Sequence, residues 1–229
     1  MNKCKTLITS ILLVAFATAV PLVSWSMGGG DLSAFAREPA RLLLVFVNAP
    51  FFFAAPLAAR RIGNVASKGD RQEHMRRQDW MVPLSTALSL ALAVLSPWSD
   101  AAGVWTLPGG AALRWIGLGI YTIGGVLMVW APLHLGALFS IRVTIQESHH
   151  LVTDGPYTLL RHPRYAGCVY WGLALPLVFL SLPGLIAALL YSLTFVWRIR
   201  DEELLLAEHF GDAWRSYARR TKRLIPYVL

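Results

Sequence analysis

Residues 151–171, LVTDGPYTLLRHPRYAGCVYW, concentrate side chains that can do chemistry at the start of an apolar segment. Pro163 stands where helices favour proline, in the first turn, so Arg161 and His162 are expected at the entrance of a helix. Backbone N–H groups are unpaired there and the helix dipole ends positive, which stabilises a carboxylate or a phosphate. The pattern therefore predicts a site for an anionic ligand group.

Three neighbouring side chains extend this stretch. Arg164 adds fixed positive charge, while Tyr157 and Tyr165 carry amphipathic rings that suit either a ligand's ring or the membrane interface. Anchoring of the chain at the interface by arginine and tyrosine would use the same residues. From residue types alone, the stretch is therefore either a ligand site or an ordinary interfacial anchor.

A second group of ionisable residues follows the last apolar segment. Arg198 and Glu202 are four residues apart, so they share one face of a helix, and Glu203 comes next. Ionisable side chains at the edge of a membrane segment are functional candidates by default. A structural Arg–Glu pair is the alternative, and an exposed pair of this kind would stabilise the fold little.

The composition indicates a membrane protein rather than a soluble one. Of the 229 residues, 55% are hydrophobic and only 15% are charged, whereas soluble domains carry about 25% charged residues. The net charge of +8 comes from residues between apolar stretches, which fits loops facing an anionic membrane surface better than a nucleic-acid interface. Cys4 and Cys168 are far apart and lack metal-ligand spacing, so neither a disulfide nor a metal site is expected.

Apolar runs predict an all-α, polytopic fold. The candidate membrane helices are six segments: 6–25, 40–59, 80–98, 114–135, 165–181 and 184–197. A hydrocarbon core of about 30 Å needs about 20 helical residues, which the first four segments supply. Pro183 and Gly184 separate the last two, which are expected to form a short helical hairpin followed by a cytoplasmic C-terminal helix. The glycines within 114–135 predict a small-residue face for close helix packing.

Lysine and arginine set the expected orientation. Of the 21 such residues, only Arg37, Arg41 and Arg114 lie outside the N-terminus and segments 60–79, 141–164 and 198–229. Six spans with both termini in the cytoplasm satisfy the positive-inside rule. We therefore expect an integral protein of a bacterial inner membrane, with the ligand site facing the cytoplasm. The basic start and apolar run at the N-terminus also fit a signal peptide, but a retained first helix is favoured.

The two chemical groups and the hairpin between them resemble the isoprenylcysteine carboxyl methyltransferases, within a wider group that includes phospholipid methyltransferases. The shared residues, in order, are Gly155, Tyr157, Arg161-His162-Pro163, Tyr165, Gly167, Glu202-Glu203, Phe210-Gly211 and Tyr217. The resemblance covers residues 134–226. We therefore divide the chain into N-terminal transmembrane helices, 1–110, and a methyltransferase core, 111–229.

This resemblance implies a membrane-embedded methyltransferase that uses S-adenosylmethionine. It implies a cofactor pocket formed by His150, Leu151, Val152, Tyr157, Arg161, His162, Tyr165, Glu202 and Glu203. Arg198 and Glu203 would be the catalytic residues. Carboxyl methylation of an isoprenylcysteine-like acid needs no base, since the carboxylate is already ionised, and Arg198 would hold it. An amine or thiol acceptor would need a proton acceptor, for which Glu203 or His162 is a candidate.

Arg164 departs from the small or apolar residue that the family often has between proline and tyrosine, which predicts a contact with an acidic ligand group or a lipid headgroup. The acceptor is expected to be a lipidic small molecule dissolved in the membrane, with no nucleic acid and no obligate protein partner. Three alternatives stay open: methylation of phospholipid amines or small thiols, an NADPH-dependent reductase of the sterol-reductase type, which has a related Arg-His-Pro-x-Tyr end, and a non-catalytic membrane protein.

Overall fold

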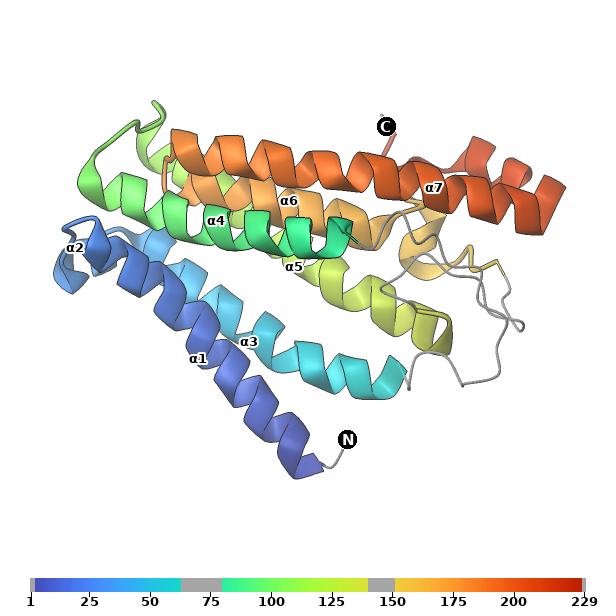
Figure 1. Cartoon of the computed structure of the whole chain (residues 1–229), viewed down its shortest axis with the longest axis horizontal. Coiled ribbons are helices and arrows are strands. Elements are labelled where there is room, and N and C mark those ends of the chain that lie inside the picture. The colour runs from blue at the N-terminus through green and yellow to red at the C-terminus, as the bar shows by residue number, and fades with distance from the viewer. Residues whose placement is uncertain (1–2, 63–79, 140–150, 228–229) are drawn as a thin grey trace.

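The computed structural model describes residues 3–62, 80–139 and 151–227, which are helical apart from turns, short loops and isolated bridges (Figure 1). In chain order the elements are α1 (Lys3–Met27), α2 (Leu32–Ala36), α3 (Pro39–Ile62), α4 (Met81–Ala102), α5 (Gly110–Leu135), η2 (Gly136–Leu138), η3 (Gly155–Thr158), α6 (Pro163–Val178) and α7 (Leu182–Arg220). The all-α, polytopic prediction is confirmed. His150, one of the expected pocket residues, lies outside the described residues.

Five of the described helices are long and apolar enough to cross a membrane, namely α1, α3, α4, α5 and α7. The remaining expected span, α6, has only 16 residues, about 24 Å of helix, and it packs against both α5 and α7. Successive helices run in alternate directions: α2 lies at one end of the bundle, while α3 and α5 end toward the other (Figure 1). This is the architecture of an integral membrane protein.

The turn between α6 and α7 comes earlier than expected. α6 ends at Val178 and α7 begins at Leu182, so Pro183 lies in the first turn of α7, where its missing N–H costs no hydrogen bond. The Ser181 hydroxyl accepts a hydrogen bond from the Gly184 backbone N–H (3.0 Å) and so caps α7. The predicted hairpin exists, but Pro183 and Gly184 start its second helix instead of separating the two.

Glycine allows α5 and α6 to pack backbone against backbone. A Cβ added to Gly124 would lie 2.7 Å from the backbone nitrogen of Trp171 and 2.8 Å from the Gly167 carbonyl oxygen. These distances are too short for any side chain, so the predicted small-residue face of α5 is confirmed at Gly124. Gly119, by contrast, has open space where its Cβ would be. The close approach fixes α6, and with it the residues at the start of α6, against α5.

Two of the three arginines assigned to the non-cytoplasmic side are buried at the α2 end of the bundle. Arg114 donates hydrogen bonds to both carboxylate oxygens of Asp100 (2.7 and 2.8 Å) and to the Val178 carbonyl (2.6 Å). Arg41 lies 3.6 Å from the same carboxylate and 4.2 Å from the centroid of the Trp25 ring. These arginines therefore join α3, α4 and α5 to the end of α6 and are not exposed loop charges.

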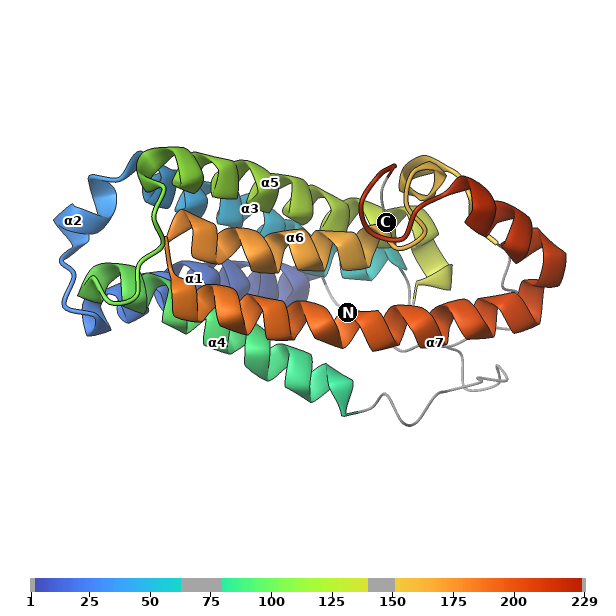
Figure 2. The same cartoon turned by 90° about the horizontal axis from the view of Figure 1, so that it is seen from above.

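α7 positions the second group of candidate residues. Its first part, from Leu182 to Phe210 before a break at Gly211, corresponds to about 43 Å of helix, longer than a hydrocarbon core of about 30 Å. Its charged second half therefore continues past the other helices (Figure 1). At Gly211 the backbone leaves helical geometry (φ 53°, ψ −121°), and the last part of α7 turns back toward the loop before α6 (Figure 2). The expected C-terminal helix is therefore interrupted at Gly211, where glycine permits the positive φ.

Candidate active site

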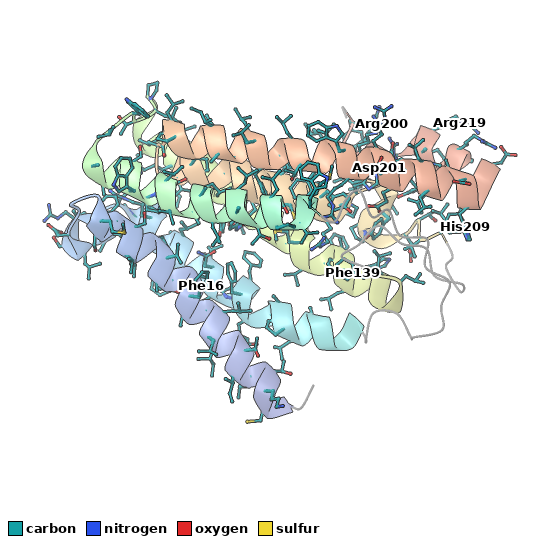
Figure 3. All side chains as sticks on the ribbon, in the orientation of Figure 1. Phe16, Phe139, Arg200, Asp201, His209 and Arg219 are labelled. Atoms are coloured by element: carbon teal, nitrogen blue, oxygen red, sulfur yellow. The ribbon has the colours of Figure 1, made fainter. Side chains whose placement is uncertain are left out.

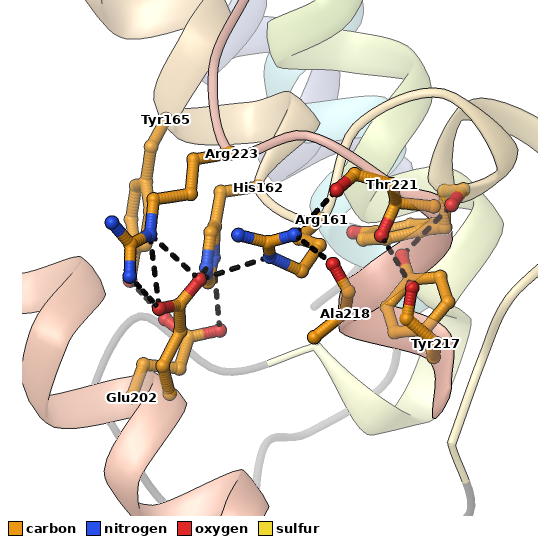
Figure 4. Close-up of polar contacts among 10 residues, drawn as sticks. Arg161, His162, Tyr165, Glu202, Tyr217, Ala218, Thr221 and Arg223 are labelled. Carbon is orange, nitrogen blue, oxygen red and sulfur yellow. Dashed lines mark hydrogen bonds and ion pairs between the residues drawn. The ribbon is translucent and has the colours of Figure 1, made fainter. Parts of the chain in front are cut away.

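Glu203 is the centre of an ion cluster from three parts of the chain, and Figure 4 labels its partners Arg161, His162 and Arg223. Its Oε1 accepts a hydrogen bond from Arg161 Nε (3.0 Å) and lies 3.3 Å from His162 Nε2. Its Oε2 accepts hydrogen bonds from Nη2 (2.7 Å) and Nε (3.0 Å) of Arg223. The start of α6, the far half of α7 and the C-terminal segment thus meet at one carboxylate.

The pKa of Glu203, which lies beyond the apolar half of α7, is well below its ordinary value. Burial raises this pKa, but the hydrogen bonds from His162 and Arg223 and the charge of Arg161 lower it by more. The carboxylate is therefore ionised at neutral pH and holds a proton weakly. It is well suited to fixing the cationic side chains around it, and poorly suited to accepting a proton from an amine or a thiol.

Residues 217–224, which we call the C-terminal strap, close over the start of α6. The backbone N–H groups of Arg161 and His162 donate to two strap carbonyls (2.7 and 3.2 Å), as in a pair of parallel strands. The Arg161 guanidinium also donates to the carbonyls of Ala218 (2.6 Å) and Thr221. The Arg161 guanidinium therefore donates its hydrogen bonds to the strap and to Glu203, and so connects the two.

Tyr165 and Glu202 form a second polar contact between α6 and α7. The Tyr165 hydroxyl donates to Glu202 Oε2 (2.7 Å). The Tyr165 ring stacks with the His162 ring, with centroids 5.7 Å apart, and it meets Phe195 of α7 at 5.5 Å. The contact therefore combines a partly exposed carboxylate, whose side chain is 30% accessible, with stacked aromatic rings.

Arg198 lies one turn of α7 before Glu202, on the side of α7 that faces α6. Its guanidinium carbon is 5.7 Å from the centroid of the Tyr165 ring, and only 5% of the residue is exposed. The fold thus brings Arg198 beside Tyr165. A buried guanidinium beyond the apolar half of a membrane helix can hold an anionic group that reaches it from the bilayer.

An apolar cluster lies beside the ion cluster. It contains three of the expected pocket residues, Tyr157, Leu151 and Val152, together with Trp214 and Tyr217. The Tyr217 hydroxyl donates to the Tyr157 carbonyl (2.8 Å). Burial raises the pKa of both phenols, that of Tyr217 to about 12, so both are neutral at physiological pH. The turn at Gly211 buries Trp214 and Tyr217 against the loop before α6.

Arg164, which we expected to contact an acidic ligand group or a lipid headgroup, lies over an aromatic ring. Its guanidinium carbon lies 4.9 Å from the Phe139 ring centroid, close to the end of α5. A second contact from the end of α5 joins His134 Nε2 to Asp154 Oδ1 (3.0 Å). A Cβ on Gly155, which has a φ of +56°, would collide with the His134 ring at 2.5 Å. The end of α5 therefore fixes the turn that leads into the candidate site.

Sequence reasoning missed Arg223 and His134. Arg223 is one of several basic residues in the C-terminal tail, and no local pattern distinguishes it from Arg219 or Arg220. His134 stands alone at the end of an apolar run. A signal was available for the strap in the Phe-Gly pair at 210–211, because glycine permits the positive φ that turns the tail back.

The family model described as "Isoprenylcysteine carboxyl methyltransferase (ICMT) family" matches residues 115–208. This range covers α5 from its second turn, α6 and the part of α7 that carries Arg198, Glu202 and Glu203, and it ends before the strap. The comparison therefore covers both groups of candidate residues.

Several curated proteins are similar to the chain. Protein-S-isoprenylcysteine O-methyltransferase B of Arabidopsis thaliana is 31% identical over 148 residues, which cover 62% of this chain and 74% of that protein. The Xenopus laevis protein-S-isoprenylcysteine O-methyltransferase is 31% identical over 152 residues, 63% of this chain and 53% of that protein. A probable protein-S-isoprenylcysteine O-methyltransferase of rice (Oryza sativa subsp. indica) is 26% identical over 82% of this chain and 94% of that protein.

A solved structure shares the fold. It is the eukaryotic intramembrane Ras methyltransferase ICMT, with a TM-score of 0.51 and 20% sequence identity over all of this chain and 88% of that one. At this identity the match shows the fold of the membrane helices. Together with the curated relatives it relates the chain to integral membrane methyltransferases.

Proposed function

The chain belongs to the isoprenylcysteine carboxyl methyltransferase family, and from this we propose that it transfers a methyl group from S-adenosylmethionine to the carboxylate of an isoprenylcysteine-like acid. Membership makes it a methyltransferase of the membrane. The donor, the acceptor and the residue roles are our proposal. The observation that carries it is the position of Arg198, buried beside the Tyr165–Glu202 contact and one turn before the Glu203 ion cluster.

The side chains around Tyr165 fit the chemical groups of S-adenosylmethionine. The stacked rings of His162 and Tyr165 suit its adenine and its sulfonium. Glu202 is reachable from solvent and suits a ribose hydroxyl or the ammonium group. When bound, this cofactor supplies a methyl group activated by the neighbouring positive sulfur. Tyr157, Leu151 and Val152 would support the pocket wall from the apolar cluster.

The acceptor carboxylate needs alignment rather than activation, because it is ionised at neutral pH. Arg198 would hold this carboxylate and turn one oxygen toward the methyl carbon. No proton has to move, which agrees with a Glu203 whose pKa is lowered and whose oxygens are occupied by Arg161 and Arg223. Glu203 would act by holding the start of α6 in place. The geometry thus favours carboxyl methylation over methylation of an amine or a thiol.

In the sequence, nearly all the lysine and arginine fall in the N-terminus and the segments expected on the same side as the site, so we infer that the site and both termini face the cytoplasm. The Arabidopsis, Xenopus and rice relatives are eukaryotic. A location in a bacterial inner membrane stays a prediction from the sequence. The acceptor would approach from the bilayer, since the helices around Arg198 are apolar.

Binding of S-adenosylhomocysteine and NADPH to the detergent-purified protein, measured by calorimetry, tests the donor. We expect saturable binding of S-adenosylhomocysteine, weakened in Glu202→Gln, and no binding of NADPH. Glu208→Gln, which removes an acid from the same helix, is the matched control. Binding of NADPH alone would identify a reductase, and binding of neither would contradict an enzyme of this type.

Transfer of a radioactive methyl group then tests the acceptor. We expect label in a base-labile ester when an S-prenylated cysteine is offered, either free or at the end of a protein. Base-stable label in phosphatidylethanolamine or in a small thiol would instead establish one of the alternative acceptors.

A further inference from the structure

A cavity of about 180 Å³ lies among α1, α3, α4, α5 and α6, away from the candidate active site. Its wall includes Phe16 and Ala17 of α1, Leu44 of α3, and Leu90 and Ala93 of α4. All of these helices except α6 are candidate membrane spans. The cavity therefore sits at the depth of the bilayer's hydrocarbon core, between the N-terminal helices and the α5–α6 pair.

Both hydroxyl groups in the cavity wall donate hydrogen bonds to other protein groups. The Tyr121 hydroxyl donates to the Asn48 side-chain oxygen, and the Ser89 hydroxyl donates to the Thr86 carbonyl (2.8 Å). The rest of the wall is hydrocarbon and aromatic rings. A wall of this kind offers little to water or to a charged ligand, and it favours an apolar occupant.

The cavity borders the lipid-facing surface of the protein. Phe16 and Leu90 belong to its wall, yet 54% and 45% of their surfaces are exposed on the outside of α1 and α4. Figure 3 shows Phe16 midway along α1. A chain lying in the bilayer can therefore reach the cavity between these two helices without crossing a polar region.

The cavity and the candidate active site lie on different sides of α6. Trp171 lines the cavity and packs against Tyr121 of α5, with ring centroids 5.7 Å apart. Tyr165, six residues earlier, faces Phe195 and Glu202 of α7. Six residues correspond to about 9 Å along a helix. The two places are thus separated both around and along α6.

We propose that this cavity binds an acyl chain of a membrane lipid, which fills the space between α1, α4 and the α5–α6 pair. A cavity of about 150 Å³ in a protein core accommodates a molecule as large as benzene, so this one accepts a short length of hydrocarbon chain. Leaving such a space empty destabilises a protein, because its lining loses contacts. In the bilayer, hydrocarbon chains are the available filling material. The lipid would hold the N-terminal helices in place, a role separate from methyl transfer.

Two neighbouring alanines of α1 provide a matched pair of variants. Ala17 lines the cavity, whereas Ala19 is exposed on the outside of the same helix. Ala17→Phe should fill the cavity, and Ala19→Phe adds the same ring toward the bilayer. Ala93→Phe fills the cavity from α4 and replaces Ala17→Phe if that variant does not fold.

Native mass spectrometry of protein purified in mild detergent measures phospholipid retention. We expect wild type and Ala19→Phe to retain one phospholipid, and Ala17→Phe and Ala93→Phe to retain at least tenfold less. Equal retention in the filled variants and Ala19→Phe would overturn the proposal. Retention is read without turnover, so this result is independent of whether the methyltransferase proposal holds.

The other source of a hydrocarbon chain is the acceptor, and a second measurement separates the two. If an S-prenylated cysteine displaces the retained phospholipid, and Ala17→Phe abolishes the dependence of its binding on prenyl length, the cavity belongs to the acceptor and the lipid assignment is wrong. If prenylated ligand leaves the phospholipid in place, the lipid assignment stands.

Discussion

Arg223 binds the Glu203 carboxylate through two guanidinium nitrogens: Nη2 lies 2.7 Å and Nε lies 3.0 Å from Oε2. The two residues are 20 positions apart, and the turn at Gly211 brings them together. Glu203 in turn holds Arg161 through its other oxygen (3.0 Å). A residue of the C-terminal tail therefore controls how firmly the start of α6 is held, although half of its side chain is exposed.

Replacing Arg223 should loosen the candidate site without removing a residue that touches the ligand. A hydrogen bond to a charged group contributes about 1.5–3 kcal/mol, and exposure reduces this to about 1 kcal/mol. We therefore expect Arg223→Gln to weaken S-adenosylhomocysteine binding about fivefold, by calorimetry. Arg223→Lys keeps the charge but loses the two-nitrogen contact, and should fall between wild type and Arg223→Gln.

Arg220→Gln is the matched control, because it removes the same charge from the same tail and Arg220 is exposed. Equal effects of the Arg220 and Arg223 changes would mean that only the overall charge of the tail matters, and the positioning role would be excluded.

The lowered pKa of Glu203 makes stability depend on pH at acidic values. In the folded protein this carboxylate stays ionised below its ordinary pKa of about 4.5. Its contribution is therefore complete above pH 4.5 and is lost as the pH falls toward the lower folded-state value. We expect the thermal unfolding midpoint to fall more steeply below pH 4.5 in wild type than in Glu203→Gln. Identical slopes in the two proteins would show that Glu203 is not held by its cationic neighbours.

Arg198 is expected to act on the acceptor and not on the cofactor. Removing a preorganised charge from the reacting group commonly costs about 10²–10³ in rate. Arg198→Ala should therefore lower turnover of an S-prenylated cysteine about 100-fold while S-adenosylhomocysteine binds within about threefold of wild type. Steady-state kinetics and calorimetry on the same preparation measure both. A large loss of cofactor affinity would assign Arg198 to the cofactor pocket, and Arg198→Lys indicates whether charge alone suffices.

Local sequence features predicted the parts of the fold that depend on local forces. Apolar run length located the membrane helices, and Pro163 located the start of α6 with Arg161 and His162 before it. The expectation that these residues share a pocket with Glu203 came from the family resemblance, since no local pattern connects positions 41 or 42 residues apart.

Contacts made by the backbone were beyond prediction. The strap binds Arg161 and His162 through carbonyl groups, which every residue has, so no side-chain pattern marks it. The burial of Trp214 against Tyr157 depends on the direction that the tail takes after Gly211. The sequence shows a glycine there but not the angle of the turn. For the same reason Arg223 looked like one more solvent-exposed basic residue.

The packing of α5 on α6 makes Gly124 sensitive to a single methyl group. A Cβ there would lie 2.7 and 2.8 Å from backbone atoms of Trp171 and Gly167, and backbone atoms cannot move aside as a flexible side chain can. Overpacking of this kind costs about 1–3 kcal/mol, so Gly124→Ala should lower the thermal unfolding midpoint by several degrees and reduce cofactor binding, because α6 begins at the candidate site.

Gly119→Ala on the same helix meets no atom within 4 Å and should leave the midpoint unchanged or raise it, since alanine favours helix more than glycine does. If both variants unfold at the same temperature, α5 and α6 do not pack as closely as the structure places them.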